Sequence, residues 1–328
     1  MSSLLEVKDL RIAFVDRFRT LVAVDRASFA IAPGEVLGIA GESGAGKSLT
    51  ASAIIGLLEA PGRITRGEIR LEGKRIDNLS FDEMRRIRGG KIGMVFQDPS
   101  TSLNPLYTVG RQLSETIRTH FPLSRRDARQ RAIRLLGKVG IPGPSERFDH
   151  YPHQFSGGMR QRVVIALALC AEPKLVIADE PTAALDVSVQ AQIIGVLKGL
   201  CKEQGAAVML ITHDMGVIAE TADRVAIMYA GHIVEVGRVA DVIRNAKHPY
   251  TIGLIGAIPR IGDDREALIQ IDGSMPHLRE MPSGCAFHPR CGYAVPPCFS
   301  ERPDLLPVDD GKEHQEVACH VVDRQLAR

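Results

Sequence analysis

The sequence predicts an α/β protein whose mainly parallel sheet is flanked by helices and followed by a small second domain. Three apolar runs, residues 36–40, 175–178 and 206–211, have the length of buried strands, and each is followed by glycine or polar residues. Residues with helical apolar spacing lie between these runs, and buried strands that alternate with helices form parallel sheets covered on both faces. After about residue 245, prolines and histidines become more frequent and the helical spacing fades, which indicates a domain boundary.

The other segments predict the remaining elements. Residues 4–14 and 21–35 carry short alternating apolar runs with a Pro-Gly turn after them, and residues 67–76 are similar, so we expect antiparallel strands there. From about residue 111 to 172 the pattern is helical, with breaks at glycine and proline. The predicted divisions are a main domain over 1–250, a helical subdomain over about 100–170 and a C-terminal domain over 251–328.

The composition is that of a soluble globular protein. The chain has 328 residues, of which 45% are hydrophobic and 24% charged, and its net charge is +2. This charge supplies no basic field for nucleic acid, and the basic residues at 125–134 are interpreted as a solvated helix face. The longest apolar run, residues 163–171, is too short to span a bilayer and is interpreted as a buried helix. No secretory signal is visible at the N-terminus, so we expect a cytoplasmic protein.

Residues 41–48, GESGAGKS, fit the pattern G-x-x-x-x-G-K-S and lie between a predicted strand and a predicted helix. The glycines allow a tight loop whose backbone N–H groups form a concave anion site, and the following helix adds its positive N-terminal end. Lys47 is expected to reach the β- and γ-phosphates of a nucleotide, and the Ser48 hydroxyl to bind Mg²⁺. The pattern therefore predicts a phosphate-binding loop.

An acidic pair follows the second buried strand, in KLVIADEP at residues 174–181. Asp179 is expected at the carboxyl edge of the sheet, where open parallel sheets bind ligands, and would hold Mg²⁺ mostly through water. Glu180 is expected to activate the attacking water as a general base. With the loop upstream, the pair predicts an NTPase, but it leaves the class of NTPase open.

Residues 155–162, FSGGMRQR, resemble the signature motif of ABC-type ATPases, which is usually met as L-S-G-G-Q. Phe155 and Met159 replace the commoner leucine and glutamine, whereas the Ser-Gly-Gly core is kept and opens a predicted helix. A helix N-terminus of this kind is a second anion site. The resemblance implies an ABC-type ATPase fold over about residues 4–240.

Further motifs follow in the family's order. Gln97 resembles the Q-loop residue, AALD at 183–186 the D-loop, and His213 the switch histidine. In this family two subunits enclose two ATP molecules, each between the phosphate-binding loop of one subunit and the signature motif of the other. The catalytic residues that the resemblance implies are Lys47, Gln97, Glu180 and His213. Magnesium would be held at Ser48, Gln97 and Asp179.

The expected nucleotide contacts come from several motifs. An aromatic residue upstream of the loop should stack on the base, and Phe14 is preferred to Phe18. The expected nucleotide-binding set is Phe14, Gly41, Glu42, Ser43, Gly44, Ala45, Gly46, Lys47, Ser48, Leu49, Gln97, Asp179, Glu180 and His213. The residues expected to act on the partner subunit's nucleotide are Ser156, Gly157, Gly158 and Met159, with Asp186 in the D-loop.

Two further segments resemble the oligopeptide and dipeptide permease ATPases, residues 97–113 after the Q-loop and residues 247–260 after the ATPase core. In these systems the region after the Q-loop receives a short helix of a membrane subunit. In this chain the region could form an apolar groove suited to receive such a helix. The alternative is that the same residues pack the helical subdomain. The residues in question are Leu103, Pro105, Leu106 and Tyr107.

Four of the six cysteines have the spacing C-x5-C-x6-C-x20-C, at Cys285, Cys291, Cys298 and Cys319. The spacing alone leaves a metal site and unlinked thiols equally open, because the C-x2-C knuckles of zinc ribbons are absent and disulfides are disfavoured in a cytoplasmic chain. The resemblance implies a [4Fe–4S] cluster at these cysteines, with zinc as the alternative. The other two, Cys170 and Cys201, are predicted to be core or surface residues.

Taken together, the resemblance implies the ATPase subunit of an ABC importer for dipeptides, oligopeptides or a related solute. Its expected place is peripheral, at the cytoplasmic face of the inner membrane. Its expected partners are two multi-pass membrane permeases, a second ABC ATPase in a heterodimer, and an external substrate-binding protein. Two alternatives stay open: a soluble ABC ATPase that acts as a regulator without transport, and a redox-sensing ATPase in which the cluster is the main function.

Overall fold

The computed structural model describes residues 3–183, 186–258, 270–308 and 315–322. The chain divides into two compact units. Unit 1 comprises Met1–Leu4, Ile31–Val36 and Asn78–Ile211, and unit 2 comprises Leu5–Ala30, Leu37–Asp77 and Thr212–Arg328. The predicted boundary near residue 250 is a different division of the chain, and it stays a prediction.

Unit 1 contains three parallel strands, β6 (Ile92–Val95), β7 (Leu175–Asp179) and β8 (Ala207–Ile211). Every residue of β7 and β8 is buried, as the continuous apolar runs predict for strands covered on both faces. In the register, Val95 lies opposite Ala178, so β6 and β7 end at the same edge. This edge carries the polar residues that follow each strand.

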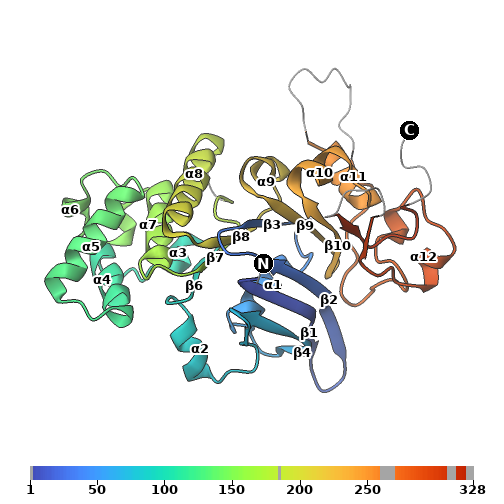
Figure 1. Ribbon diagram of the computed structural model, residues 1–328, viewed down its shortest axis with the longest axis horizontal. Coiled ribbons are helices and arrows are strands. Elements are labelled where there is room, and N and C mark those ends of the chain that lie inside the picture. Colours follow the sequence, from blue (N-terminus) through green and yellow to red (C-terminus); the bar gives the residue numbers. More distant parts are fainter. Residues whose placement is uncertain (1–2, 184–185, 259–269, 309–314, 323–328) are drawn as a thin grey trace. The chain divides into compact units, whose positions relative to one another are not determined.

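The helices of unit 1 confirm the predicted helical region and its breaks. Helix α4 packs on α5, and α7 contacts α4, α5 and α8 (Figure 1). The helices are α2 (Phe81–Ile87), α3 (Pro99–Ser102), α4 (Val109–His120), α5 (Arg125–Lys138), α6 (Pro144–Arg147), the 3-10 helix η1 (Pro152–Gln154), α7 (Gly157–Leu169) and α8 (Val187–Gln204).

Two sequence interpretations concern these helices directly. The basic segment 125–134 forms most of α5, which buries apolar residues such as Ala132 and Leu136. All of its arginines except the partly exposed Arg131 are exposed. Arg129, for example, forms an ion pair with Asp149 at 2.9 Å. The interpretation as a solvated helix face is confirmed, as is that of run 163–171 as a buried helix, most of which lies in α7.

Unit 2 begins with an antiparallel sheet in the order β2-β1-β4-β5. Its strands are β1 (Leu5–Val15), β2 (Thr20–Ile31), β4 (Gly62–Leu71) and β5 (Lys74–Arg75). Strands β1 and β4 pair antiparallel, and β4 turns into β5 through Glu72 and Gly73, both with positive φ. The antiparallel strands expected at the N-terminus and at residues 67–76 are therefore present.

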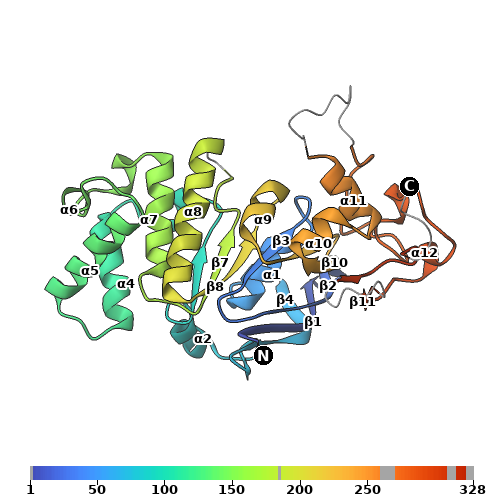
Figure 2. The same ribbon diagram turned by 45° about the horizontal axis from the view of Figure 1, so that its top comes forward.

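Unit 2 also contains strands in the order β3-β9-β10-β12-β11. Strand β3 (Val36–Ala40) is parallel to β9 (Arg224–Tyr229), and the next pairs are antiparallel. The C-terminal segment contributes the two short strands β12 (Glu316–Val317) and β11 (Leu306–Pro307) to the edge of β10 (His232–Arg238), as Figures 1 and 2 show. The sequence did not predict that this segment continues a sheet.

The helices of unit 2 are short. They are α1 (Lys47–Ile54), α9 (Met215–Thr221), α10 (Val239–Arg244), α11 (Pro249–Gly256), the 3-10 helix η2 (His288–Arg290) and α12 (Pro297–Ser300). Within the described part of the chain, no helix has both the length and the apolar character needed to cross a bilayer.

Candidate functional site

The predicted phosphate-binding loop joins β3 to α1 in unit 2. Gly41 has φ 150°, and a Cβ atom there would lie 2.1 Å from the carbonyl oxygen of Met228. Gly46, at the N-terminus of α1, has φ 103° and is similarly enclosed, with Val24 3.0 Å from the position of a Cβ. Glycine is favoured at both positions because side chains rarely adopt these backbone conformations, and at Gly41 a Cβ would also collide with the backbone.

Lys47 folds back over this loop. Its side chain is buried, and Nζ donates to the carbonyl oxygens of Gly41 at 2.7 Å and Glu42 at 2.9 Å. Ser48 is exposed on the next position of α1, so its hydroxyl lies at the surface of the site. An ammonium group held by carbonyls at the mouth of an anion-binding loop is positioned to receive a polyphosphate.

His213 also belongs to unit 2, in the segment before α9. The N–H of Thr212 donates to the carbonyl oxygen of Ile39 at 3.2 Å, which places this segment beside the strand that leads into the loop. The carboxylate of Asp214 accepts from the N–H groups of Gly216 and Val217 and so caps α9. His213 itself is exposed.

Gln97 and Glu180 meet in unit 1. Gln97 follows β6 and Glu180 follows β7, and Gln97 Nε2 donates to Glu180 Oε2 at 3.2 Å. Glu180 has φ 44°, and its N–H donates to the carbonyl oxygen of Ile211 at 2.9 Å. Asp179, the last residue of β7, is 7% exposed. Asp179 is therefore buried, whereas the Glu180 carboxylate accepts a hydrogen bond from the side-chain amide of Gln97.

The signature segment opens α7 as predicted. Ser156 is the N-cap residue, and its Oγ accepts from the N–H of Met159 at 3.4 Å. Phe155 is buried and its ring contacts His150 edge-on, with centroids 6.2 Å apart. Phe155, which replaces the usual leucine, therefore packs in the core of the helical region. Ser156 is exposed and Gly157 and Gly158 are partly exposed, so the N-terminus of the helix stays open.

The D-loop is described only in part. Residues 184–185 lie outside the described residues, whereas Asp186 is exposed at the N-terminus of α8. Of the two candidates for base stacking, Phe14 packs on Gly62, where a Cβ would lie 3.1 Å from the ring. Phe18 is 94% exposed in the loop between β1 and β2. The choice of Phe14 stays a prediction.

The segment after the Q-loop is divided between core and surface. Leu103 is 3% exposed, so for this residue the packing interpretation holds. Leu106 is 79% exposed, and Tyr107 lies under the guanidinium of Arg111, 3.9 Å from its ring centroid. Pro105 is also exposed. An apolar surface therefore remains at residues 105–107.

The four late cysteines converge within unit 2. The N–H of Cys285 donates to the carbonyl oxygen of Cys298 at 2.9 Å. Burial, and then the charges of the other three thiols, raise the pKa of Cys319 to about 12. None of the four forms a disulfide. The thiols thus lie within electrostatic reach of one another.

The metal-binding character predicted for this C-terminal segment is not shown. Within the described ranges, no three His, Cys, Asp or Glu side chains are arranged to hold a single metal ion. Of the two alternatives for the remaining cysteines, core or surface, both are core residues: Cys170 and Cys201 are 1% and 2% exposed, and burial raises the pKa of each to about 12.

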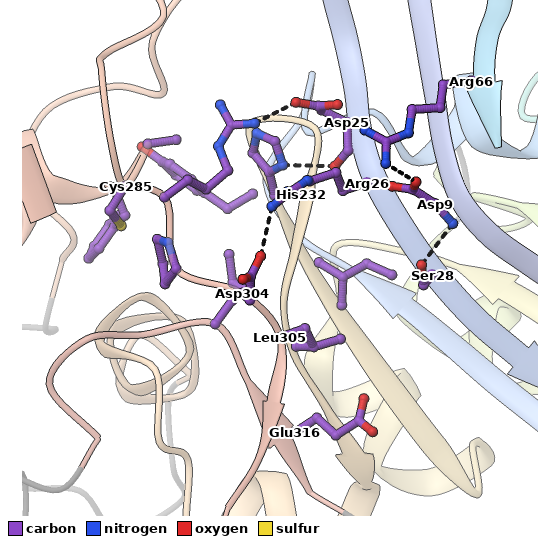
Figure 3. Close-up of a pocket in the computed structure, with 18 residues that line it drawn as sticks. Asp9, Asp25, Arg26, Ser28, Arg66, His232, Cys285, Asp304, Leu305 and Glu316 are labelled. Atoms are coloured by element: carbon purple, nitrogen blue, oxygen red, sulfur yellow. Dashed lines mark hydrogen bonds and ion pairs between the residues drawn. The ribbon is translucent and has the colours of Figure 1, made fainter. Parts of the chain in front are cut away.

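A cavity of about 410 Å³ lies beside Cys285 in unit 2 (Figure 3). Two ion pairs at its wall tie the N-terminal sheet to the C-terminal segment, Asp25 with Arg302 at 2.5 Å and Arg26 with Asp304 at 2.7 Å. None of the predicted nucleotide-binding residues lines this cavity. The two ion pairs anchor the C-terminal segment, and the cavity is separate from the phosphate-binding loop.

Two residues that contact the loop were missed by the sequence analysis. Tyr250 accepts a hydrogen bond through its hydroxyl from the N–H of Glu42 at 2.9 Å, and Arg290 forms an ion pair with the Glu42 carboxylate at 3.1 Å. Tyr250 lies in the segment 247–260, which resembles the permease ATPases, but the sequence indicated no role for this tyrosine. Arg290 carried no local signal, because its partner is 248 residues away.

Comparison with known proteins agrees with this geometry. A family described as "ABC transporter" matches residues 24–183, which include the phosphate-binding loop, the signature segment and the acidic pair. A dimeric ATP-binding cassette, solved in a post-hydrolysis state bound to ADP and Pi, is 30% identical with a TM-score of 0.65, covering 72% of this chain and 98% of that one. The fold and the site define an ABC-type ATPase.

The C-terminal region and the curated relatives narrow this class. A family described as "Oligopeptide/dipeptide transporter, C-terminal region" matches residues 234–298. The dipeptide transport ATP-binding protein DppD of Escherichia coli K12 is 46% identical, over 97% of this chain and 96% of that protein. The oligopeptide transport ATP-binding protein OppD of Bacillus subtilis 168 is 49% identical, over 94% and 87%. The chain belongs to the family of ATP-binding subunits of oligopeptide and dipeptide ABC transporters.

Proposed function

We propose that this protein hydrolyses ATP to drive the import of short peptides, as the nucleotide-binding subunit of an ABC transporter. The observation that carries the peptide assignment is the match of residues 234–298 to the C-terminal region of oligopeptide and dipeptide transporters. The relatives named for dipeptide and oligopeptide transport extend over nearly the whole chain and support the same assignment.

The phosphate-binding loop would hold ATP through its backbone N–H groups and Lys47. The enclosed glycines, Gly41 and Gly46, keep the loop narrow, and the start of α1 adds a positive helix end. Mg²⁺, which neutralises the charge on the β- and γ-phosphates, prefers oxygen ligands. The Ser48 hydroxyl, the Asp179 carboxylate and the Gln97 amide oxygen supply that donor type, and we propose them as the ligands.

Glu180 would act as the general base on the attacking water. Its carboxylate accepts a hydrogen bond from Gln97, which helps to orient it. His213, exposed beside the strand that leads into the loop, would contact the γ-phosphate. These roles follow the resemblance residue by residue, and the contact between Gln97 and Glu180 is the structural support for them.

A second ATPase subunit would complete each site. Ser156 caps α7 and leaves Gly157 and Gly158 at an open helix N-terminus, which suits a phosphate brought by the partner subunit. A dimer of a related cassette supports this arrangement. We propose a heterodimer, with Asp186 at the D-loop contacting the partner.

The membrane partners would be two multi-pass permeases, with an external substrate-binding protein delivering the peptide. The exposed residues Pro105, Leu106 and Tyr107 would receive a short helix from a permease. This docking would place the chain peripherally at the cytoplasmic face of the inner membrane. Residues 1–250 would form the nucleotide-binding domain and 251–328 the peptide-transporter domain.

We propose that the four converging cysteines hold a [4Fe–4S] cluster, with a single zinc ion as the alternative. Tetrahedral zinc with Zn–S bonds of about 2.3 Å brings its sulfur ligands to within ~4 Å of one another. Within the described ranges no group of three His, Cys, Asp or Glu residues is arranged to hold a metal ion. The support for the cluster is the resemblance, together with the electrostatic proximity of the four thiols. A cluster, which takes four thiolates around a larger core, would cross-link the segments that carry Cys285, Cys291, Cys298 and Cys319.

A pull-down of the tagged Glu180→Gln chain in mild detergent with ATP tests the proposal. ATP should hold the variant's dimer closed, so that its natural partners stay bound. We expect two multi-pass membrane proteins and a second ABC ATPase, identified by mass spectrometry. Recovery of the chain alone, or with soluble partners only, would overturn transport and favour a soluble regulator.

A further inference from the structure

The cavity of about 410 Å³ in unit 2 has the features of a small-molecule site that the nucleotide chemistry does not use (Figure 3). Its volume lies within the range of about 300–1,000 Å³ that is usual for such sites. Buried apolar side chains form what we call its floor: Tyr229, Ile233, Val234, Ala286 and Phe287. Small-molecule sites combine an apolar lining of this kind with a few placed polar groups.

Charges of both signs also line the cavity. Most of them are paired, at distances of 2.5–2.7 Å, in the ion pairs Asp9–Arg66, Asp25–Arg302 and Arg26–Asp304. Glu316 is exposed at the same cavity, and no other described residue forms a hydrogen bond or an ion pair with its carboxylate. This carboxylate is therefore available to a cationic group of a ligand.

Two nitrogen atoms of the wall add a donor and an acceptor. The Nε atom of Arg302 is buried and has no acceptor among the described residues. Such donors are rare in folded proteins, and a ligand oxygen at this wall would satisfy it. His232 donates through Nδ1 to the carbonyl oxygen of Asp25 at 2.9 Å, which leaves Nε2 as an acceptor. Burial lowers the pKa of His232 to about 4, so the ring stays neutral at physiological pH.

Part of the wall is backbone in an uncommon conformation. Asp9 has φ 48° and Arg26 has φ 55°, both in the left-handed region that residues with a Cβ rarely adopt. The register of β1 with β4 shifts between Lys8 and Arg11, so Asp9 lies at a bulge. Bulges direct side chains to new positions and, like backbone strain, are frequent at functional sites.

The floor of the cavity contacts the residues that hold the phosphate-binding loop. Tyr229 and Phe287 pack on the ring of Tyr250, with centroids 4.7 and 5.5 Å away. The Tyr250 hydroxyl accepts from the Glu42 N–H at 2.9 Å. Arg290 donates to the Tyr229 hydroxyl at 3.4 Å and to the Glu42 carboxylate at 3.1 Å. The floor is therefore one contact away from the residues that fix Glu42 in the loop.

We propose that this cavity binds a short peptide with free ends, and that the bound peptide strengthens ATP binding at the phosphate-binding loop. The peptide ammonium would pair with Glu316, a peptide oxygen would accept from Arg302, and apolar side chains would rest on the floor. A small zwitterion with an apolar body fits this lining. The choice of a peptide among such molecules rests on the proposed function, because an importer would raise the peptide concentration on the side where ATP binds.

The effect on ATP follows from the contacts of the floor. A filled cavity restricts the motion of Tyr229 and Phe287, which support Tyr250 and Arg290. The loop is then ordered at a smaller entropic cost when ATP binds, which gives positive coupling without a change of structure. The observable is the hydrogen exchange of residues 41–48, which should slow when the peptide binds.

Isothermal titration calorimetry of the full chain with the dipeptide leucylphenylalanine tests the site. We expect Glu316→Gln to raise the dipeptide Kd about tenfold, the equivalent of ~1.4 kcal/mol. Glu280→Gln alters an exposed carboxylate of the same segment outside the cavity and should leave this Kd unchanged. An N-acetylated dipeptide lacks the ammonium group, so it should bind wild type more weakly and should lose nothing further in Glu316→Gln.

Free phenylalanine separates a peptide site from an amino-acid site. It carries both charges but covers less of the floor, so it should bind at least about tenfold more weakly than the dipeptide. Equal affinity for the two molecules would overturn the peptide as the ligand. Equal dipeptide affinity in wild type, Glu316→Gln and Glu280→Gln would overturn the cavity as the site.

The coupling is measured as the Kd of a fluorescent ATP analogue with and without saturating dipeptide. We expect this Kd to fall about fivefold, and linkage requires the analogue to lower the dipeptide Kd by the same factor. Tyr250→Phe keeps the ring and removes the hydroxyl that contacts Glu42. It should bind the dipeptide as wild type does and lose most of the coupling.

The outcomes separate this proposal from the proposed function. An ATP affinity that is the same with and without dipeptide would overturn the coupling. A chain that binds ATP but not the dipeptide would overturn the site and leave the proposed function intact. A chain that binds no ATP would overturn the proposed function and the coupling, while calorimetry would still decide whether the cavity binds the dipeptide.

Discussion

Glu180 combines a strained backbone with a side chain held for chemistry. Its φ of 44° is uncommon for a residue with a Cβ and costs about 1–3 kcal/mol. The strain is sustained because the buried strand before it and the hydrogen bond from its N–H to Ile211 fix the turn. The turn directs the carboxylate to Gln97, which donates a hydrogen bond to it.

Glu180→Gln should retain ATP binding and lose hydrolysis. The amide keeps the size of the side chain but cannot take a proton, so we expect turnover to fall by about 10²- to 10⁴-fold. The Kd for ATP should stay within about twofold, since the loop that binds the phosphates is unchanged. Phosphate release and nucleotide binding measure the two quantities.

The control for Glu180→Gln is Glu203→Gln, which alters an exposed carboxylate on α8 paired with Lys138. Its turnover should match that of wild type. Near-normal hydrolysis by Glu180→Gln would remove Glu180 from the role of base.

His248 makes the stability of unit 2 depend on pH. Burial lowers its pKa from 6.5 to about 3, so the folded protein keeps the ring neutral while the unfolded chain protonates it below pH 6.5. The contribution is fully present above pH 6.5 and is lost as pH falls, by up to about 1.4 kcal/mol per pH unit. His248→Asn keeps a capping side chain, and should flatten the dependence of the free energy of unfolding on pH by about one proton.

Urea denaturation between pH 6.5 and 5 measures this difference. Glu235, which accepts from the N–H of His248 and whose pKa is raised by burial, titrates in both proteins, so the comparison isolates the histidine. Identical slopes for wild type and His248→Asn would show that the buried ring is not the source of the pH dependence.

At the scale of single elements, the phosphate-binding loop depends on glycine at specific positions. Gly41→Ala combines a φ of 150° with a Cβ placed 2.1 Å from the Met228 carbonyl oxygen, so backbone must move to accept it. We expect a loss of about 2–4 kcal/mol in the free energy of unfolding, together with loss of ATP binding. Thermal unfolding and nucleotide titration measure these effects.

Gly73→Ala separates backbone strain from steric clash. Gly73 has φ 76°, and nothing lies within 4 Å of a Cβ built there, so only strain of about 1–2 kcal/mol should appear. ATP binding should be retained, because Gly73 is exposed at the β4–β5 turn and nothing lies close to the added methyl group. A Gly41→Ala protein as stable as Gly73→Ala would contradict the proposed clash.

Elements such as β7 and α7 could be predicted from the sequence. The buried strand β7 is a run of apolar residues that ends in Asp179, and α7 starts at a serine that can cap it. These signals are local, because strand burial and helix capping depend on neighbours in sequence. Phe155 shows the limit, since the sequence marked it as a departure and only packing shows that it fills the core.

The contacts that could not be predicted join distant parts of the chain. Tyr250 and Arg290 reach Glu42 across 208 and 248 residues, and β12 pairs with β10 across about 80. No periodicity or spacing encodes such pairs, because they depend on how the folded segments meet. The sequence therefore predicted the motif residues of the site but not Tyr250 and Arg290, which contact the loop.

At the scale of the whole molecule, the C-terminal segment is bound to unit 2 by separate sets of contacts. The short strands extend a sheet, Arg302 and Asp304 form ion pairs with the N-terminal strands, and Arg290 pairs with Glu42 in the phosphate-binding loop. Exposed ion pairs contribute little individually. A segment with few buried apolar residues gains most from a bound metal centre, which cross-links its parts only in the folded state.

The metal content of cysteine variants tests whether a metal centre cross-links the C-terminal segment. The chain purified without oxygen should carry about four iron atoms and four sulfide ions, the content of one [4Fe–4S] cluster. Cys291→Ser should lose most of the iron and lower the temperature at which the C-terminal segment unfolds, whereas Cys201→Ser alters a buried core thiol and should keep the iron. One zinc per chain in place of iron would overturn the cluster, and full iron in Cys291→Ser would remove that cysteine as a ligand. The four cysteines lie on separate stretches of the segment, Cys298 in α12 and the other three outside helices and strands. If they share one cluster, loss of any one ligand should affect all of them, so Cys319→Ser is expected to behave as Cys291→Ser does.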